Sequence, residues 1–256
     1  MKIVVIIPAR LNSSRLPGKV LLDIASKPMV QHVYEAAKKA KLVSDVYIAT
    51  DSKEVQEVCL DFTQNVLMTD ASHESGTDRL AEAVQSIECD GVINVQGDEP
   101  LIDPNLIDAL ATELQEGYAM VSAMHRIETT KELASPNAVK VVVNNKSEAL
   151  YFSRSIIPHH RDEWESLIKR HKTVPEALNF FKHIGIYGYT KEFLQNYAQL
   201  EQTYLEKLEK LEQLRVLENG HTIKMIQTSY VPVGVDVQED LEEVRKIFGN
   251  KKVAKI

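Results

Sequence analysis

The chain has 256 residues, of which 44% are hydrophobic and 26% charged, and 30 basic against 37 acidic side chains give a formal net charge of −7. These values are typical of globular proteins and exclude collagen-like, disordered and disulfide-stapled chains. The negative balance argues against nucleic acid or anionic lipid as partners, because a basic face would have to form against the overall field. The two cysteines, Cys59 and Cys89, have no metal-ligand spacing, so we expect reduced thiols.

The first apolar run, residues 3–9, is too short for a signal peptide or a membrane span. It contains Pro8 and is followed at once by Arg10, and no run of about 18 apolar residues occurs elsewhere. We therefore expect a soluble cytoplasmic protein with no membrane insertion. Because Ile3–Ala9 is continuously apolar, it predicts a fully buried strand.

Short β-type runs then alternate with helical patterns. Asp51-Ser52 and Asp103-Pro104 are typical helix starts. In chain order, the patterns predict a helix over 29–40, a strand over 45–50, a helix over 53–62, a strand over 65–68, a helix over 78–87, a strand over 91–95 and a helix over 105–116. This alternation predicts an α/β fold with a mostly parallel central sheet and helices on both faces.

The second half of the chain is less regular. It predicts a β-hairpin over 138–143 and 149–152, a polar surface segment over 159–182, a strand over 184–189, one long helix over 200–217, a brief strand over 234–237 and a last helix over 238–248. No linker or internal repeat separates these elements. We expect one domain, 1–256, with a β-hairpin/helix subdomain inserted at about 138–220.

The loop after the first strand, residues 8–19, concentrates positive charge in an acidic protein. It reads P-A-R-L-N-S-S-R-L-P-G-K and carries Arg10, Arg15 and Lys19. In an open α/β sheet, ligands bind beyond the carboxyl ends of the strands, where these cations would suit a polyphosphate. The loop is neither a Walker A motif nor a G-x-G-x-x-G fingerprint. A solvated basic loop is the alternative interpretation.

Two other strand ends carry acids. Residues 94–100 read N-V-Q-G-D-E-P and place Asp98 and Glu99 after a buried strand, while Asp236 stands between Val235 and Val237. Mg²⁺ prefers one or two carboxylates, with phosphates and water completing its octahedron. The alternative is a helix-capping role for each acid.

Four further features leave a binding role and a structural role open. The turn S-G-T-D-R at 75–79 suits a nucleoside or, through Thr77 or Asp78, a helix cap. Arg154 ends a strand, and His183 begins one. In L-E-K-L-E-K-L-E-Q-L-R, Glu206 and Lys210 have the i,i+4 spacing of a solvated ion pair. Glu212 lies on the apolar face, either paired with Arg215 or held toward a ligand.

Together these segments resemble the 3-deoxy-manno-octulosonate cytidylyltransferase (CMP-Kdo synthetase) family. The matching pieces, in order from residue 6 to residue 242, are I-I-P-A-R-x-x-S-S-R-L-P-G-K, A-T-D, S-G-T-D-R, N-V-Q-G-D-E-P, L-Y-F-S-R, H-I-G-I-Y-G-Y, L-E-Q-L-R and V-D-x-x-E-D-L-E. The resemblance implies a Rossmann-like nucleotide-diphospho-sugar transferase fold and a homodimer. It also implies Mg²⁺-dependent transfer of CMP from CTP to the anomeric hydroxyl of Kdo, which supplies lipopolysaccharide synthesis.

The resemblance also assigns residues to roles. It implies that Arg10, Arg15 and Lys19 hold the triphosphate, with Lys19 nearest the α-phosphate, and that Asp98 and Asp236 bind Mg²⁺. Ser75 and Arg79 fall in the segment that the family uses near the nucleotide. The residues implied in the sugar pocket are Gln96, Arg154, His183, Tyr187, Glu212 and Gln213.

Other functions remain as alternatives. The same reaction on 8-amino-Kdo or a sialic acid keeps the class and changes the sugar. A nucleotide-sugar glycosyltransferase would need a D-x-D motif, which Gly97-Asp98-Glu99 does not supply. A catalytically silent binding module is disfavoured because every implied phosphate and metal group is present.

Overall fold

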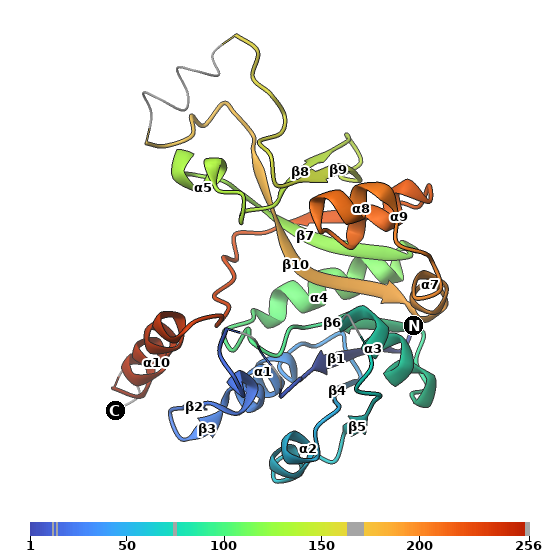
Figure 1. Cartoon of the computed structure of the whole chain (residues 1–256), viewed down its shortest axis with the longest axis vertical. Coiled ribbons are helices and arrows are strands. Elements are labelled where there is room, and N and C mark those ends of the chain that lie inside the picture. Colours follow the sequence, from blue (N-terminus) through green and yellow to red (C-terminus); the bar gives the residue numbers. More distant parts are fainter. Residues whose placement is uncertain (12, 14, 74–75, 163–171, 254–256) are drawn as a thin grey trace.

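The central feature of the protein is one nine-stranded sheet (Figure 1). The computed structural model describes residues 1–253 except 12, 14, 74–75 and 163–171. The main path of the sheet runs β11-β7-β10-β6-β1-β4-β5, and β8 and β9 join the sheet through β10. Strands β6, β1, β4 and β5 are parallel neighbours, whereas β10 is antiparallel to β6 and β7. The predicted α/β fold with a mostly parallel sheet is confirmed.

The elements have these bounds. The strands are β1 Ile3–Pro8, β2 Asp23–Ile24, β3 Lys27–Pro28, β4 Asp45–Thr50, β5 Val66–Met68, β6 Gly91–Asn94, β7 Met120–Arg126, β8 Lys140–Val143, β9 Ala149–Ser153, β10 Phe181–Thr190 and β11 Lys224–Gln227. The helices are α1 Met29–Ala37, α2 Lys53–Leu60, α3 Gly76–Ala83, α4 Pro104–Gln115, α5 Thr130–Ala134, α7 Lys191–Tyr197, α8 Tyr204–Glu209, α9 Gln213–Glu218 and α10 Gln238–Val253, with 3₁₀ turns η1 Lys19–Leu21 and η2 Val84–Ser86.

Helices cover both faces of the sheet, as predicted. Side chains alternate along β1: Ile3, Val5 and Ile7 pack in one apolar cluster with α1, α2 and α4. Val4 and Ile6 point the other way, toward α3, α7 and α9. Since β1 is buried on both sides, its apolar run is continuous rather than alternating.

The long helix predicted over 200–217 is wrong. The chain forms α8, turns at Lys210 in the left-handed region (φ 55°), and resumes as α9. The break lets Arg215 of α9 fold back onto Glu206 of α8, with contacts of 2.6 and 2.8 Å. The predicted solvated pair between Glu206 and Lys210 is therefore wrong too, because Glu206 is buried and bonded to Arg215.

Two other predictions need correction. Residues 234–237 form no strand; they are irregular chain that leads into α10. In the segment predicted to be a surface excursion, Val174 and Phe180 are buried against Ile127 and Leu133, and residues 163–171 lie outside the described part of the chain. Strands β7 and β11 and helices α5 and α7 were not predicted. No helix among the described residues is long and apolar enough to cross a membrane.

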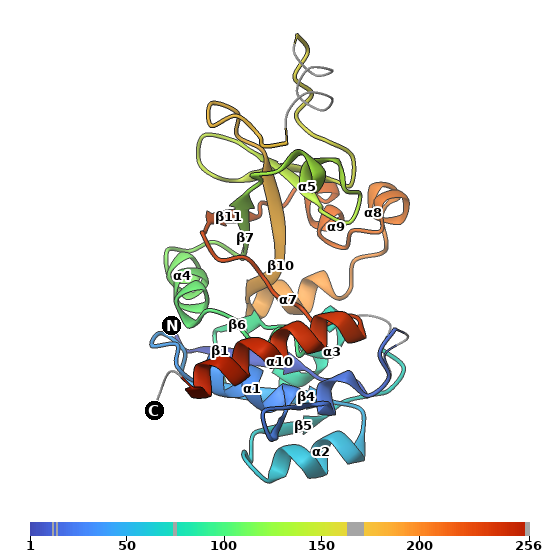
Figure 2. The ribbon, with the colours of Figure 1, turned by 90° about the vertical axis from the view of Figure 1, so that its left-hand side faces the viewer.

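The C-terminal helix packs beside the N-terminal part of the chain. Figure 2 shows α10 lying across the side of the molecule that carries α1. Leu241 and Val244 of α10 share a cluster with Ile24 and Met29. This packing carries the segment before α10, including Asp236, to the carboxyl end of β1. The predicted insertion at about 138–220 places β8 and β9 on the same sheet through β10, and its boundaries stay a prediction.

Candidate active site

Lys19 brings the two predicted acidic positions together. Gly18, at φ 65°, allows the turn into η1, and the Lys19 ammonium then lies 2.5 Å from Asp98 Oδ2 and 3.1 Å from Asp236 Oδ1. Burial alone would lower the pKa of Lys19, but the two carboxylates outweigh it and the pKa is raised. Three distant segments therefore meet at one cation.

The backbone holds the same junction. Val235 N donates to Asp98 O at 2.9 Å, and Lys19 Nζ donates to Val235 O at 3.2 Å. Gly97 permits close approach, because a Cβ there would lie 2.7 Å from Pro8 O. The helix-cap alternatives are not observed: Asp103 caps α4, and Asp240 accepts from the amides of Asp236 and Val237.

The basic loop is only partly solvated. Arg15 Nη2 lies 2.9 Å from Asp236 Oδ1 and remains exposed, whereas the Lys19 side chain is only 15% exposed. Burial, reinforced by Arg79, lowers the pKa of Arg10, which stays charged at neutral pH. All three predicted cations thus lie at the edge of the sheet where the acids arrive.

Two adjoining cavities meet at this junction. The smaller, of about 310 Å³, is lined by Arg10, Ser13, Lys19 and Gly97 among others. The larger, of about 440 Å³, extends toward β10 and α9. Gly76, Gln96 and Asp98 line both. Two ligands bound side by side would therefore meet at Gln96 and Asp98, next to Lys19.

Besides Gln96, three other residues predicted in the sugar pocket line the larger cavity. They are Tyr187, Glu212 and Gln213. Thr77 Oγ1 donates to Glu212 Oε2 at 3.0 Å, and Tyr197 OH donates to the Glu212 carbonyl at 2.9 Å. The interpretation of Glu212 as paired with Arg215 is wrong, since Arg215 binds Glu206. Thr77 contacts Glu212 from within the first turn of α3 rather than capping that helix.

Arg154 and His183 do not line the larger cavity. The Arg154 guanidinium donates to the carbonyls of Glu209, Lys210 and Pro136, so it braces the turn between α8 and α9. His183 is buried between Ser122 and Gln213, and burial lowers its pKa to about 3. A neutral imidazole cannot serve as a cation for a sugar carboxylate.

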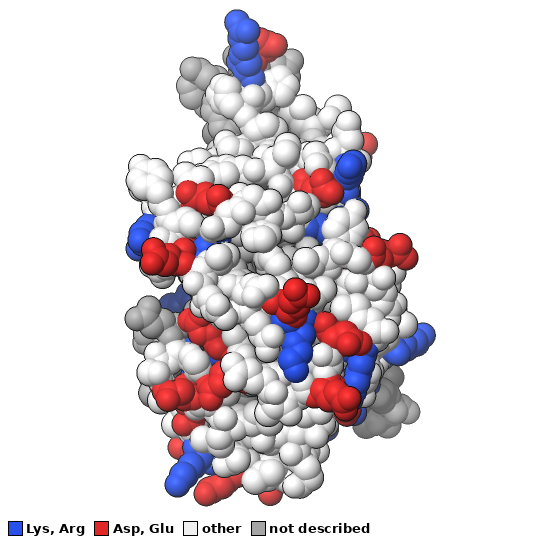
Figure 3. All heavy atoms as spheres, turned by 90° about the vertical axis from the view of Figure 1, so that its right-hand side faces the viewer, with Lys and Arg blue, Asp and Glu red and all other residues white. Residues whose placement is uncertain are grey.

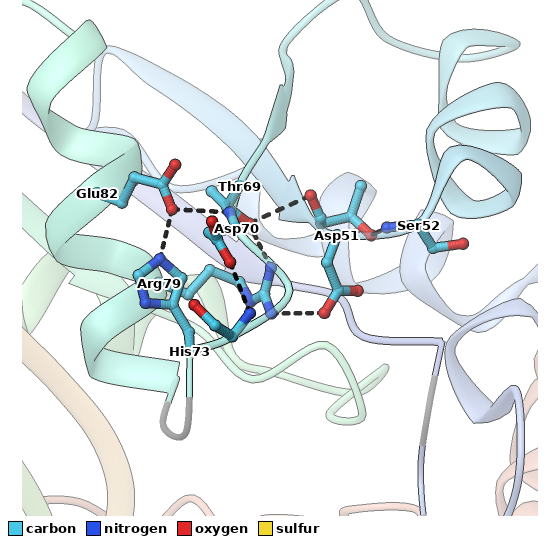
Figure 4. Close-up of polar contacts among 9 residues, drawn as sticks. Asp51, Ser52, Thr69, Asp70, His73, Arg79 and Glu82 are labelled. Carbon is cyan, nitrogen blue, oxygen red and sulfur yellow. Dashed lines mark hydrogen bonds and ion pairs between the residues drawn. The ribbon is translucent and has the colours of Figure 1, made fainter.

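Arg79 is likewise withdrawn from the cavities. It is fully buried, and Figure 4 shows its guanidinium bonded to Asp51 and Thr69. The Asp51 contact is 2.7 Å. Arg79 therefore joins the A-T-D segment at the end of β4 to Thr69, which follows β5, and to the helix that begins at Gly76. Ser75, the other predicted residue of this motif, lies outside the described part of the chain.

Several lining residues were not predicted. Asn94, Tyr189, Tyr197 and Lys210 reach the larger cavity from β6, β10, α7 and the α8–α9 turn. Lys210 is the one cation among the described residues lining this cavity. Its left-handed backbone follows from the unpredicted helix break, so the sequence pattern carried no signal for it. Asn94 could have been found, because it opens the motif that holds Asp98.

Comparisons with known proteins agree with this geometry. The family profile described as Cytidylyltransferase matches residues 4–224. A 3-deoxy-manno-octulosonate cytidylyltransferase of Geobacter metallireducens is 49% identical, with 95% of this chain and 96% of that protein covered. The Haemophilus influenzae protein of the same name is 48% identical over 97% and 99%. The chain belongs to the 3-deoxy-manno-octulosonate cytidylyltransferase family.

A solved structure matches nearly the whole length of this chain. A solved structure of a CMP:2-keto-3-deoxy-manno-octonic acid synthetase complexed with CTP matches with a TM-score of 0.89 and 42% identity, covering 98% of this chain and 100% of that one. As a member of the 3-deoxy-manno-octulosonate cytidylyltransferase family, the chain has the Rossmann-like nucleotidyltransferase fold and is a nucleotidyltransferase enzyme.

The Cys59 and Cys89 thiols are free and buried, and burial raises the pKa of Cys59 to about 12.

Proposed function

We propose that this enzyme transfers CMP from CTP to the anomeric hydroxyl of Kdo. The hydroxyl oxygen forms a bond to the α-phosphorus, the bond from that phosphorus to the bridging oxygen breaks, and pyrophosphate leaves while the hydroxyl proton passes to water. The observation that carries the proposal is the Lys19–Asp98 junction between the two cavities, supported by the family to which the chain belongs.

The three cations support this chemistry: Arg10 and Lys19 line the smaller cavity, and Arg15 contacts Asp236 at 2.9 Å. We assign Arg10, Arg15 and Lys19 to the triphosphate, with Lys19 at the α-phosphate. A hydroxyl attacking an anionic phosphorus needs charge neutralisation and alignment more than covalent help. Because Lys19 is largely shielded from water, its charge acts on the α-phosphate more strongly than an exposed lysine would.

The acid pair supports a magnesium site. Asp98 and Asp236 already share one cation, the Lys19 ammonium, so their donor set fits a divalent ion. No cluster of three or more His, Cys, Asp or Glu side chains suited to a metal occurs among the described residues. Two carboxylates suit Mg²⁺, which takes its remaining ligands from phosphates and water. Bound there, Mg²⁺ would stabilise charge on the phosphates.

The larger cavity supports sugar binding. Gln96, Tyr187, Glu212 and Gln213 offer donors and acceptors for hydroxyl groups. Arg154 and His183 support the cavity wall from behind instead of facing the ligand. Arg79 does the same on the nucleotide side, where it braces the helix that begins at Gly76.

We also propose a homodimer and a place in lipopolysaccharide synthesis. Tyr204 and Leu208 on α8 are 72% and 66% exposed, and Leu150 on β9 is 59% exposed, which suits an interface. The reaction needs CTP, so the cytoplasm is the proposed compartment. On the face of Figure 3, lysine and arginine are interspersed with aspartate and glutamate, a distribution that does not suggest a nucleic-acid surface.

The test is pyrophosphate release from CTP with a panel of sugar acids. We expect turnover with Kdo and Mg²⁺, and none when CTP is replaced by ATP or when Mg²⁺ is removed by chelation. Faster turnover with 8-amino-Kdo or N-acetylneuraminate would transfer the proposal to that sugar. No turnover with any sugar acid, while CTP still binds, would contradict it.

A further inference from the structure

A bulge in β10 exposes two carbonyls to a buried serine. The pairing of β10 with β7 shifts between Ile184 and Tyr187, and Ser122, which is fully buried on β7, lies opposite. Ser122 Oγ is 2.9 Å from Ile186 O and 3.3 Å from Ile184 O. Since a carbonyl only accepts, the single hydroxyl proton of Ser122 is used on these oxygens.

The donation of the Ser122 hydroxyl proton to these carbonyls sets the tautomer of His183. His183 Nε2 lies 2.9 Å from Ser122 Oγ. Because the serine proton is already donated, Nε2 must carry a hydrogen and donate it, so Nδ1 is the unprotonated nitrogen. The imidazole ring packs edge-on against Phe152, with 5.0 Å between the two ring centroids. This contact restricts rotation of the imidazole.

The histidine in turn orients the side-chain amide of Gln213. Gln213 Nε2 is 3.4 Å from His183 Nδ1, and Gln213 Oε1 accepts from Tyr187 OH at 3.3 Å. The reverse orientation would set the amide oxygen against the Nδ1 lone pair. Gln213 is only 4% exposed and lines the larger cavity. The second amide hydrogen has no other partner among the described residues and is available to a ligand in that cavity.

We propose that Ser122 and His183 are positioning residues that make Gln213 a hydrogen-bond donor to the sugar acid. The inference rests on the proposed function. It assigns to Gln213 an acceptor oxygen of the sugar, such as the carboxylate or ring oxygen, and it places His183 behind Gln213 rather than against the substrate. Ser122 acts two hydrogen bonds away from Gln213 and three away from the ligand.

The first test is Ser122→Ala, with Ser86→Ala as the matched control. Ser86 is exposed on η2 and bonds only its own turn. Without an acceptor at residue 122, the buried Nε2–H is unsatisfied, so the proton moves to Nδ1 and the Gln213 amide reverses. We expect the KM for Kdo to rise roughly tenfold or more, the factor for one lost hydrogen bond to an anion. The KM for CTP should stay within about twofold.

Two further measurements separate positioning from general damage. Long-range ¹H–¹⁵N spectra should show His183 protonated at Nε2 in the unmodified enzyme and at Nδ1 in Ser122→Ala. Ser122→Thr restores the hydroxyl and should restore both the tautomer and the KM for Kdo. An unchanged tautomer in Ser122→Ala, or equal rises of both KM values, would overturn the inference. If the unmodified enzyme does not turn over Kdo, the proposed function is wrong. The spectra then still show whether Ser122 sets the tautomer of His183.

Discussion

Removing one partner of the buried ion pair between Arg79 and Asp51 should destabilise the fold strongly, because the other charge is left buried and unpaired. Arg79 is fully buried, and the Asp51 side chain is 19% exposed. Asp51→Ala leaves an uncompensated guanidinium with Thr69 as its remaining partner. Breaking a buried pair in this way costs about 3–5 kcal/mol of unfolding free energy. Because Asp51 is partly exposed, we expect a loss at the lower end, about 3 kcal/mol.

The chain length converts that loss into a melting temperature. At about 2.1 cal/mol/K per residue, 256 residues give an unfolding entropy near 0.54 kcal/mol/K, which is about 2 °C for each kcal/mol. We therefore expect Asp51→Ala to lower the melting temperature by about 6 °C in calorimetry. The control is Asp61→Ala, because Asp61 is exposed at the end of α2 and should change stability by less than about 0.5 kcal/mol.

The double variant Asp51→Ala/Arg79→Met provides the decisive comparison. It removes the buried charge together with its partner, so it should unfold at a higher temperature than Asp51→Ala alone. Thr69 still donates to Thr50 O in that variant. The electrostatic reasoning is refuted if Asp51→Ala behaves like the Asp61 control, or if the double variant is no more stable than Asp51→Ala alone.

Three further predictions concern the junction itself. Lys19→Met should lower kcat roughly a hundredfold or more with less than a tenfold change in the KM for CTP; equal effects on both would contradict an α-phosphate role. Asp98→Asn should abolish activation in a Mg²⁺ titration of pyrophosphate release, whereas Asp61→Asn should titrate normally; normal activation of Asp98→Asn would exclude ligation. Gly97→Ala would bring a Cβ to 2.7 Å from Pro8 O and should reduce kcat/KM at least tenfold, since Asp98 must shift. Gly249→Ala should leave the kinetics unchanged, because a Cβ there would meet no described atom within 4 Å outside the backbone of its own helix.

The first half of the fold could be predicted because its local signals agree with one another. The apolar runs of β1, β4 and β6 and the caps at Ser52 and Asp103 were all visible in the sequence, and the structure confirms them. In a parallel sheet each buried strand reads as a continuous apolar run. Strand β7 was missed because Ser122 and His125 interrupt its apolar pattern, although both are buried.

The second half was harder because long-range contacts override local periodicity. Residues 200–217 have helical spacing throughout, yet the chain breaks at Lys210. The two helices then pair through Arg215 and Glu206, and Arg154 donates to the carbonyls exposed at the break. Arg154 lies 55 residues before Glu209, and Glu206 and Arg215 are nine residues apart, a separation that a continuous helix does not bring together. The periodicity alone therefore predicted one helix.

The site divides in the same way between what motifs indicate and what burial decides. Charged residues at strand ends predicted Lys19, Asp98 and Asp236 correctly as one cluster, because parallel strands end at a common edge and the segment before α10 returns to it. For His183 the motif indicated the neighbourhood but not the charge, since an imidazole enclosed by Ser122, Gln213 and Phe152 is neutral. A histidine held in this state can transmit orientation but cannot attract an anion. Under the proposed function, the sugar carboxylate is recognised by groups that face the cavity, and the proposal names Gln213, oriented by His183 and Ser122, as one such donor.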